Sequence, residues 1–150
     1  MERIVVGVDG SPASGVALRW AIDEARCHQA ALEAVYAWHD VYIGGEYPIA
    51  STLMVPTLYE DAGEKLLDTI VEAEDETGLV APISRLLVRG SPAHAILEAA
   101  KGADLIVIGS RGRGGFTGLL LGSVSQQVVH HATCPVVVIP LESDKGNLEA

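Results

Sequence analysis

Five short apolar runs, each of strand length, alternate along this chain with four stretches that carry helix signals. The apolar runs cover residues 4–8, 31–38, 83–88, 103–108 and 136–139. Strands separated by helices form parallel sheets with right-handed crossovers, and the helices cover both faces. A chain of 150 residues without an internal repeat is long enough for one domain with a sizeable core. The sequence therefore predicts one α/β domain over residues 1–150, built on an open parallel sheet of five strands.

Two of the helical stretches begin with the same signal. Ser11 is followed by Pro12, and Ser91 is followed by Pro92. Serine is favoured at the N-cap of a helix and proline at its first position. We expect one helix from Ser11 to about residue 28 and another from Ser91 to residues 101–102.

A long connection precedes the second helical stretch. Residues 40–56 contain two adjacent glycines, two prolines and few charges. A connection of this length is unusual in a compact domain, so we interpret it as a lid, a partner surface or a mobile loop. Thr57 and Glu60 have the spacing of a capping box, and Gly78 is a typical helix end. The predicted helix buries three apolar residues, Leu66, Ile70 and Ala73.

A glycine-rich stretch, residues 109–125, lies between the fourth predicted strand and a last helix at 124–131. We expect Ser123 to be the N-cap of that helix, with Gln126 completing a capping box. Bare backbone N–H groups and the positive end of a helix dipole make such a place suitable for a phosphate. Glycine allows the backbone to approach a ligand closely.

The glycine spacing excludes two common phosphate loops. No glycine in the stretch is followed by Lys-Ser or Lys-Thr, as a P-loop requires. Gly112 and Gly114 begin like a dinucleotide fingerprint, but its third glycine position is Thr117. The spacing present is Gly109-x2-Gly112-x9-Gly122-Ser123.

This spacing resembles the G-x2-G-x9-G-[ST] motif of the ATP-binding branch of the universal stress protein family. Residues 4–11, 88–96, 104–112, 121–125 and 134–140 also resemble family segments, so the likeness covers nearly the whole chain. It implies a single-domain, Rossmann-like fold of the adenine nucleotide alpha hydrolase type, with strand order 3-2-1-4-5. In that order the first and fourth strands are neighbours, and ligands bind in the crevice beyond their carboxyl ends.

The resemblance implies ATP, with Mg²⁺, as the ligand of this crevice. The implied site residues are Gly7, Asp9, Ala37, Ile108, Gly109, Gly112, Gly122, Ser123, Val124 and Ser125. The backbone of Gly7, Ala37 and Ile108 borders the adenine in this hypothesis. The backbone from Gly112 and from 122–125 donates to phosphates, and the hydroxyls of Ser123 and Ser125 add donors.

Several of these residues have a purely structural alternative. Asp9 contacts the ribose or a phosphate-bound metal in the hypothesis, whereas a helix-cap or turn role is its alternative. Helix capping at Gly122 and Ser123 is compatible with ligand binding. Arg111 and Arg113 are either phosphate neighbours or solvated loop residues.

Composition narrows the function classes. The formal net charge of −10 argues against binding to nucleic acid or to an anionic membrane. No apolar run reaches about 18 residues and the first residues do not resemble a signal peptide, so we expect a cytoplasmic protein. Two cysteines without a CxxC pair exclude a disulfide framework and a zinc site, and we expect both to be packing residues. The acidic residues at 72–76 are interpreted as a solvated helix face.

Three functions remain open. The first is a dimeric, ATP-binding regulatory or stress-response protein whose nucleotide state changes its contacts with an unknown partner. The second is a slow ATPase or another nucleotide hydrolase, although no catalytic constellation is visible near the loop. The third is a dimeric interaction protein that binds no nucleotide. We expect a homodimer through the apolar strand 136–139 at the sheet edge, unless the tail at 141–150, predicted to be flexible, covers it.

Overall fold

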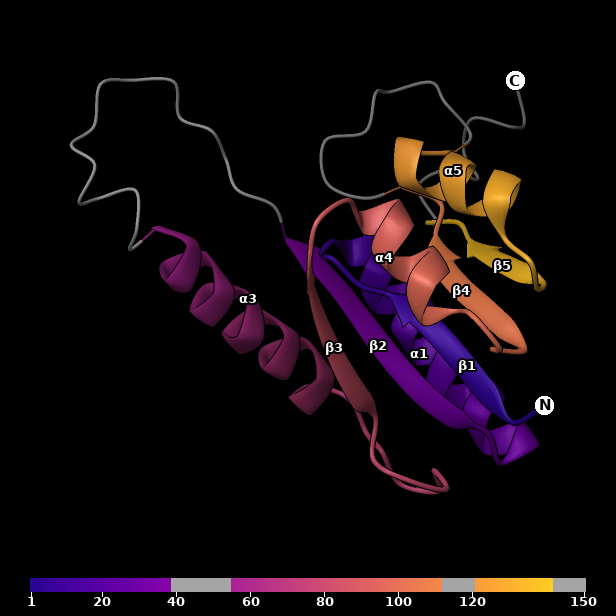
Figure 1. Cartoon of the computed structure of the whole chain (residues 1–150). Helices are drawn as coiled ribbons and strands as arrows, with labels where there is room; N and C mark the ends of the chain where they lie inside the picture. Colours follow the sequence, from indigo (N-terminus) through magenta and orange to yellow (C-terminus); the bar gives the residue numbers. More distant parts are fainter. Residues whose placement is uncertain (39–54, 112–120, 142–150) are drawn as a thin grey trace.

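The fold was analysed in a computed structural model, of which we describe residues 1–38, 55–111 and 121–141, with side chains of the second segment from residue 59 onward. A parallel five-stranded sheet forms its centre, in the order β3-β2-β1-β4-β5 (Figure 1). The predicted α/β class and strand order are confirmed. The strands are β1 (Arg3–Gly7), β2 (Ala31–Trp38), β3 (Ser84–Arg89), β4 (Leu105–Gly109) and β5 (Val136–Ile139).

Helices cover both faces of the sheet, as predicted. They are α1 (Pro12–His28), α3 (Val55–Glu72), α4 (Pro92–Ala99) and α5 (Ser123–His131). One core cluster joins α1 and α3 to the sheet, and a second joins α4 and α5 to the opposite face. Figure 1 shows α4 and α5 in front of the sheet and α1 behind it. The chain thus winds from β1 towards β3 and then returns past β1 to β4 and β5.

The predicted helix starts at the two Ser-Pro pairs are confirmed. Ser11 is the N-cap of α1, and its hydroxyl accepts a hydrogen bond from the backbone N–H of Ser14 at 3.3 Å. Ser91 is the N-cap of α4, where its side chain makes no cap hydrogen bond. The prolines follow at the first helical positions, where a missing N–H costs nothing because that group has no intrahelical partner.

The predicted limits of α3 were wrong, and its predicted buried face was right only in part, because Leu66 and Ile70 are half-buried and Ile70 packs against the first core cluster. The helix begins at Val55, so Thr57 lies inside it, and it ends at Glu72, well before Gly78. Its buried residues Gly63, Leu67 and Val71 follow a spacing of four, whereas Ala73 is exposed. A Cβ atom on Gly63 would lie 3.0 Å from Leu87 of β3, so the helix packs closest at that glycine.

The early end of α3 has a local cause in the acidic segment that follows it. The Asp75 carboxylate accepts from the N–H of Thr77 at 2.9 Å, and the Glu76 carboxylate accepts from the N–H of Ile83 at 2.7 Å. Arg26 of α1 donates to the carbonyl of Thr77 at 2.8 Å. Acidic side chains that bond nearby backbone favour turns over helix, so residues 73–76 lie outside the helix and are not the predicted helix face.

Smaller differences concern strand limits and cysteines. The third and fourth strands begin one and two residues later than expected, at Ser84 and Leu105. Cys134 is half-buried against the second core cluster, but Cys27 is exposed, so its predicted packing role was wrong. Within the three described segments, no helix is both long and apolar enough to cross a membrane.

Candidate functional site

The candidate site lies where the winding of the sheet reverses, between the neighbouring strands β1 and β4. Their register pairs Val6 with Val107, so Gly7 and Ile108 follow side by side. Helix α1 begins beyond the end of β1, and α5 follows β4 in the chain. Open α/β sheets bind ligands at such a reversal, beyond the carboxyl ends of the strands.

A network of short hydrogen bonds orders the turn from β1 to α1. The Asp9 carboxylate accepts from the N–H of Ser11 at 2.8 Å, and the Asp9 N–H donates to the Ser14 hydroxyl at 3.3 Å. That hydroxyl in turn donates to the carbonyl of Ser11 at 3.0 Å. Gly10 has φ +77°, a conformation that residues with a side chain rarely adopt. The turn alternative for Asp9 is therefore present in the structure, and its role towards a ligand stays a prediction.

Two predicted site glycines lie close to helices that pack on the sheet. A Cβ on Gly7 would lie 2.6 Å from Cδ1 of Ile96 in α4, the end of a flexible side chain. A Cβ on Gly109 would lie 2.9 Å from the Cβ of Ala13 in α1 and 3.0 Å from its backbone carbonyl carbon. Close approach of α1 to the end of β4 thus explains Gly109 without a ligand. Ile108 is buried beside the two glycines, with 3% of its surface exposed.

The predicted cap of α5 was wrong by one residue. Gly122 is the N-cap, in an extended conformation with φ −71°, and Ser123 is the first helical residue. The Gly122 N–H donates to the carbonyl of Ser110 at 2.7 Å, so the predicted donation of this group to a phosphate would compete with a bond within the fold. A Ser123 N-cap would have made the capping box with Gln126. Instead the N–H of Gln126 donates to the Gly122 carbonyl at 3.0 Å.

Helix α5 presents three backbone donors at its start. Among the described residues, no acceptor bonds the N–H groups of Ser123, Val124 and Ser125. The first N–H groups of a helix have no intrahelical partner, and the helix dipole adds a partial positive charge there. This helix start is therefore suited to hold an anion such as a phosphate group.

The hydroxyl of Ser125 has a different role from the one predicted. It lies 2.8 Å from the carbonyl oxygen of Gly109 and 3.1 Å from that of Ser110. Only 3% of Ser125 is exposed. A hydroxyl has one proton to donate, and here it points to main-chain carbonyls, so the predicted donation to a phosphate would require that proton to leave them.

Sequence reasoning did not single out Ser110. It is 3% exposed, its N–H donates to the carbonyl of Ile139 at 2.8 Å, and its carbonyl accepts from Gly122 and Ser125. The only sequence signal was its position directly after a buried strand. The bonds of Ser110 therefore join the end of β5 to the start of α5.

The other predicted residues lie farther out or outside the described segments. Ala37 is half-buried near the end of β2, beside Trp38, whose ring centroid lies 5.5 Å from the guanidinium carbon of Arg89. Arg111 is half-buried at the end of a described segment. Gly112 and Arg113 fall outside the described residues, so part of the predicted phosphate loop has no structural account.

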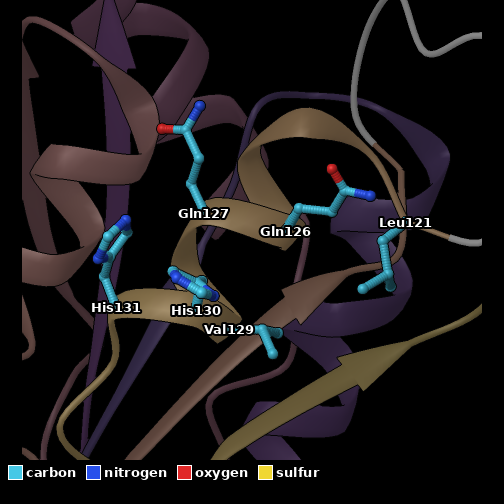
Figure 2. A pocket seen from close by; sticks show the side chains of 6 residues that line it. All are labelled: Leu121, Gln126, Gln127, Val129, His130 and His131. Carbon is cyan, nitrogen blue, oxygen red and sulfur yellow. The ribbon is translucent and has the colours of Figure 1, made fainter.

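A surface pocket lies on another side of α5 and is not the predicted crevice. It is lined by Leu121, Gln126, Gln127, Val129, His130 and His131 (Figure 2). Figure 2 shows that these side chains all come from α5 and from the residue just before its cap. None of the predicted site residues lines this pocket, so we do not assign the ligand to it.

The residues present fit a metal only as part of a nucleotide complex. In the described part of the chain, no group of three or more histidine, cysteine or acidic side chains could hold a metal ion. Mg²⁺ keeps several waters and is commonly bound by one or two carboxylates together with substrate phosphates. Asp9 could supply one such carboxylate.

Comparison with known proteins shows similarity over almost the whole chain. The model of the universal stress protein family matches residues 1–140. A universal stress protein of Mycolicibacterium smegmatis is 43% identical over 136 residues, which are 91% of this chain and 45% of that protein. The chain spans less than half the length of the curated relatives it matches.

Two solved structures are also similar. Universal stress protein UspA from Lactobacillus plantarum has a TM-score of 0.68 and 30% identity, covering 92% of this chain and 97% of that one. A universal stress protein crystallised in complex with cAMP has a TM-score of 0.65 and 29% identity, with coverage of 92% and 96%.

Proposed function

The chain belongs to the universal stress protein family, and from this premise we propose that it binds an adenine nucleotide, ATP with Mg²⁺, where β1 and β4 end. The observation that carries the proposal is the start of α5. Its N–H groups at Ser123, Val124 and Ser125 have no acceptor within the described residues. They are held beside the end of β4 through the bonds of Ser110 and Ser125. We assign the phosphates to these three N–H groups.

The remaining parts of the nucleotide follow from this placement. The adenine lies towards the ends of β1 and β2, bordered by the backbone of Gly7, Ala37 and Ile108. Asp9, at the end of β1, accepts hydrogen bonds from the ribose hydroxyls or binds Mg²⁺ on the phosphates. A relative of 29% identity that binds cAMP supports an adenine nucleotide as the ligand class.

A net charge of −10 constrains how such a ligand is held. The overall field of the protein repels a polyphosphate, so attraction has to come from the local dipole of α5, from backbone donors and from Mg²⁺. We therefore expect binding of ATP to be tighter with Mg²⁺ than with EDTA. We propose a regulatory role, in which nucleotide occupancy changes the contacts that the protein makes. We favour this role over that of an enzyme that hydrolyses the nucleotide rapidly.

Isothermal titration with ATP and Mg²⁺ tests the binding proposal. Saturable binding of ATP is expected. AMP is expected to bind more weakly because it lacks the outer phosphates. Cyclic AMP is titrated as well because a related protein binds it. Mass spectrometry of the small molecules released on denaturation identifies any nucleotide that co-purifies. The proposal fails if folded protein gives no heat with any of the three nucleotides at millimolar concentration.

We also propose that two copies of the chain pair through β5. This strand is an edge of the sheet, and its four residues Val136–Ile139 are all apolar and partly exposed. The other edge strand, β3, carries the exposed residues Ser84, Arg85 and Arg89. Charged residues on an edge oppose pairing with another chain, whereas an apolar edge favours it. A two-fold pair through β5 would bond those of its N–H and C=O groups that point away from β4, and it would close the assembly.

Light scattering on the purified chain decides this second proposal. A dimer mass at micromolar concentrations is expected, and a monomer mass throughout that range would refute it. Val138→Pro is expected to disturb pairing on the side that its N–H faces, because proline has no N–H to donate.

A further inference from the structure

The buried hydroxyl of Ser125 lies within hydrogen-bond distance of two consecutive carbonyls at the end of β4, which share its single proton. Its oxygen lies 2.8 Å from that of Gly109 and 3.1 Å from that of Ser110. The residue is the third of α5, so its own N–H is one of the three donors at the helix start. The side chain is thus bound within the protein while the backbone of the same residue faces the proposed site.

Ser110 extends this connection to the edge of the sheet. Its N–H donates to the carbonyl of Ile139, the last residue of β5, at 2.8 Å. Its carbonyl accepts from the N–H of Gly122 at 2.7 Å, as well as from Ser125. One peptide segment therefore has bonds to the end of β5 on one side and to the start of α5 on the other. We call Ser110, Gly122, Ser125 and their bonds to Gly109 and Ile139 the β4–α5 clamp.

We propose that Ser125 is a positioning residue, whose hydroxyl fixes the start of α5 against β4 and, through the β4–α5 clamp, makes the end of β5 sensitive to nucleotide occupancy. The proposal rests on the proposed function, because it concerns the same nucleotide site. A phosphate bound by the N–H groups of 123–125 restrains the first turn of α5. That restraint passes to Ser110 because two groups of the first turn and its cap, the Ser125 hydroxyl and the Gly122 N–H, bond the same carbonyl.

The geometry favours this role over direct contact with a ligand. A hydroxyl that donated to a phosphate would take this donor away from the carbonyl of Gly109 and leave that of Ser110 with the Gly122 N–H alone, and lost bonds of buried polar groups are costly. Ser110 and Ser125 are each only 3% exposed. Both are among the buried polar residues of the described segments, together with Ser14 in the first turn of α1.

Nucleotide titration of a series at position 125 tests the positioning role. Ser125→Ala removes the hydroxyl, and ATP with Mg²⁺ is expected to bind about tenfold more weakly because the helix start is no longer held. Ser125→Thr keeps the hydroxyl and is expected to bind within about threefold of the wild type. Ser125→Cys has similar size but is a weak donor, and it takes the place of the alanine variant should that one not fold.

A matched control separates positioning from general loss of stability. Val71 in α3 is fully buried on the opposite face of the sheet, far along the chain from the clamp. Val71→Ala is expected to lower the melting temperature and leave nucleotide affinity unchanged. Wild-type affinity in Ser125→Ala, or equal weakening in Val71→Ala, would overturn the proposal. If the wild type itself binds no nucleotide, the proposed function and this inference fail together.

Amide hydrogen exchange at Ser110, followed by NMR, tests the connection to β5. Saturating ATP with Mg²⁺ is expected to slow exchange of the Ser110 amide in the wild type, since that N–H bonds the carbonyl of Ile139. In saturated Ser125→Ala the slowing is expected to be smaller, because only the Gly122 N–H still bonds the Ser110 carbonyl. Nucleotide binding by the wild type with no slowing at Ser110, or equal slowing in the variant, contradicts the connection while leaving the proposed function intact.

Discussion

Gly109 at the end of β4 lies against Ala13 in the first turn of α1. A Cβ atom on the glycine would be 2.9 Å from the alanine Cβ and 3.0 Å from its carbonyl carbon. Real Cβ contacts are longer than this, and the backbone of a helix cannot move aside as a flexible side chain can. The glycine that begins the loop motif is therefore required by packing, whatever the loop binds. This contact sets the start of α1, and with it the Asp9 turn, beside the end of β4.

We predict that Gly109→Ala lowers the free energy of unfolding by about 1–3 kcal/mol, the usual cost of inserting a methyl group into a filled site. Urea unfolding followed by circular dichroism measures it. Gly15→Ala in α1 is the matched control, because its Cβ would meet only the end of Arg19 at 3.7 Å. That variant is expected to gain about 0.5–1 kcal/mol from the better helix propensity of alanine. Equal stabilities of the two variants would contradict the packing argument.

We predict that Gly122→Glu abolishes nucleotide binding while the chain still folds. Gly122 has φ −71° and ψ 170°, an extended conformation that every residue can adopt. The backbone hydrogen bond from residue 122 to the carbonyl of Ser110 is therefore expected to persist in the variant. The new carboxylate would occupy the positive end of α5 and repel phosphates. Gly122→Gln has the same length without the charge, so titration of both variants with ATP separates volume from charge. Unchanged melting temperature with wild-type affinity in both variants would place the phosphates elsewhere.

The sequence predicted those features that depend on neighbours in the chain. The Ser11-Pro12 and Ser91-Pro92 starts were found because capping is decided within one turn of helix. The alternation of apolar runs with helices predicted a parallel sheet, and the family resemblance predicted the order of its strands. The structure confirms both predictions.

Features that depend on contacts distant in the chain were missed. Ser125 was interpreted as a phosphate donor because its sequence context does not reveal the carbonyls of Gly109 and Ser110, sixteen and fifteen residues away. Gly109 was assigned to a ligand, although Ala13 explains it by packing. Tertiary packing decides such details, and periodicity alone carries no information about them.

The N-terminus of the chain offers a pH-dependent prediction away from the site. The N–H groups of Glu2 and Arg3 donate to the Asp104 carboxylate at 2.6 and 3.0 Å, and these bonds lower its pKa from the usual value of 3.8. A lowered folded-state pKa means that Asp104 stabilises the fold at pH above about 3.8 and that this contribution is lost as the pH falls through the folded-state pKa.

We therefore predict that Asp104→Ala melts at a lower temperature than the wild type near neutral pH. The difference between the two melting temperatures is expected to become smaller below about pH 4. Melting curves of both proteins in a pH series measure it. Asp104→Asn retains an acceptor without the charge and is expected to lie between them. A difference in melting temperature that stays constant down to about pH 3 would show that the charge of the Asp104 carboxylate does not contribute to stability.

The last prediction separates the two roles of Asp9. Its carboxylate accepts from the N–H of Ser11 at 2.8 Å in the turn, and we propose that it also serves the ribose or Mg²⁺. Asp9→Asn keeps an oxygen for the turn but removes the charge, so we expect wild-type stability together with weaker, less Mg²⁺-dependent binding of ATP. Asp9→Ala removes both, and we expect it to lose about 0.5–1.5 kcal/mol of stability in addition.

Titration of each Asp9 variant with ATP, in Mg²⁺ and in EDTA, gives the comparison, and urea unfolding gives the stabilities. Asp9→Asn with the affinity and Mg²⁺ dependence of the wild type would mean that Asp9 serves the turn alone. The nucleotide would then be held chiefly by the start of α5, because the three N–H groups of 123–125 do not depend on that carboxylate. Loss of binding in Asp9→Asn at unchanged stability would instead place the ligand across both strand ends, since the substitution removes the charge and one acceptor oxygen while the turn is kept.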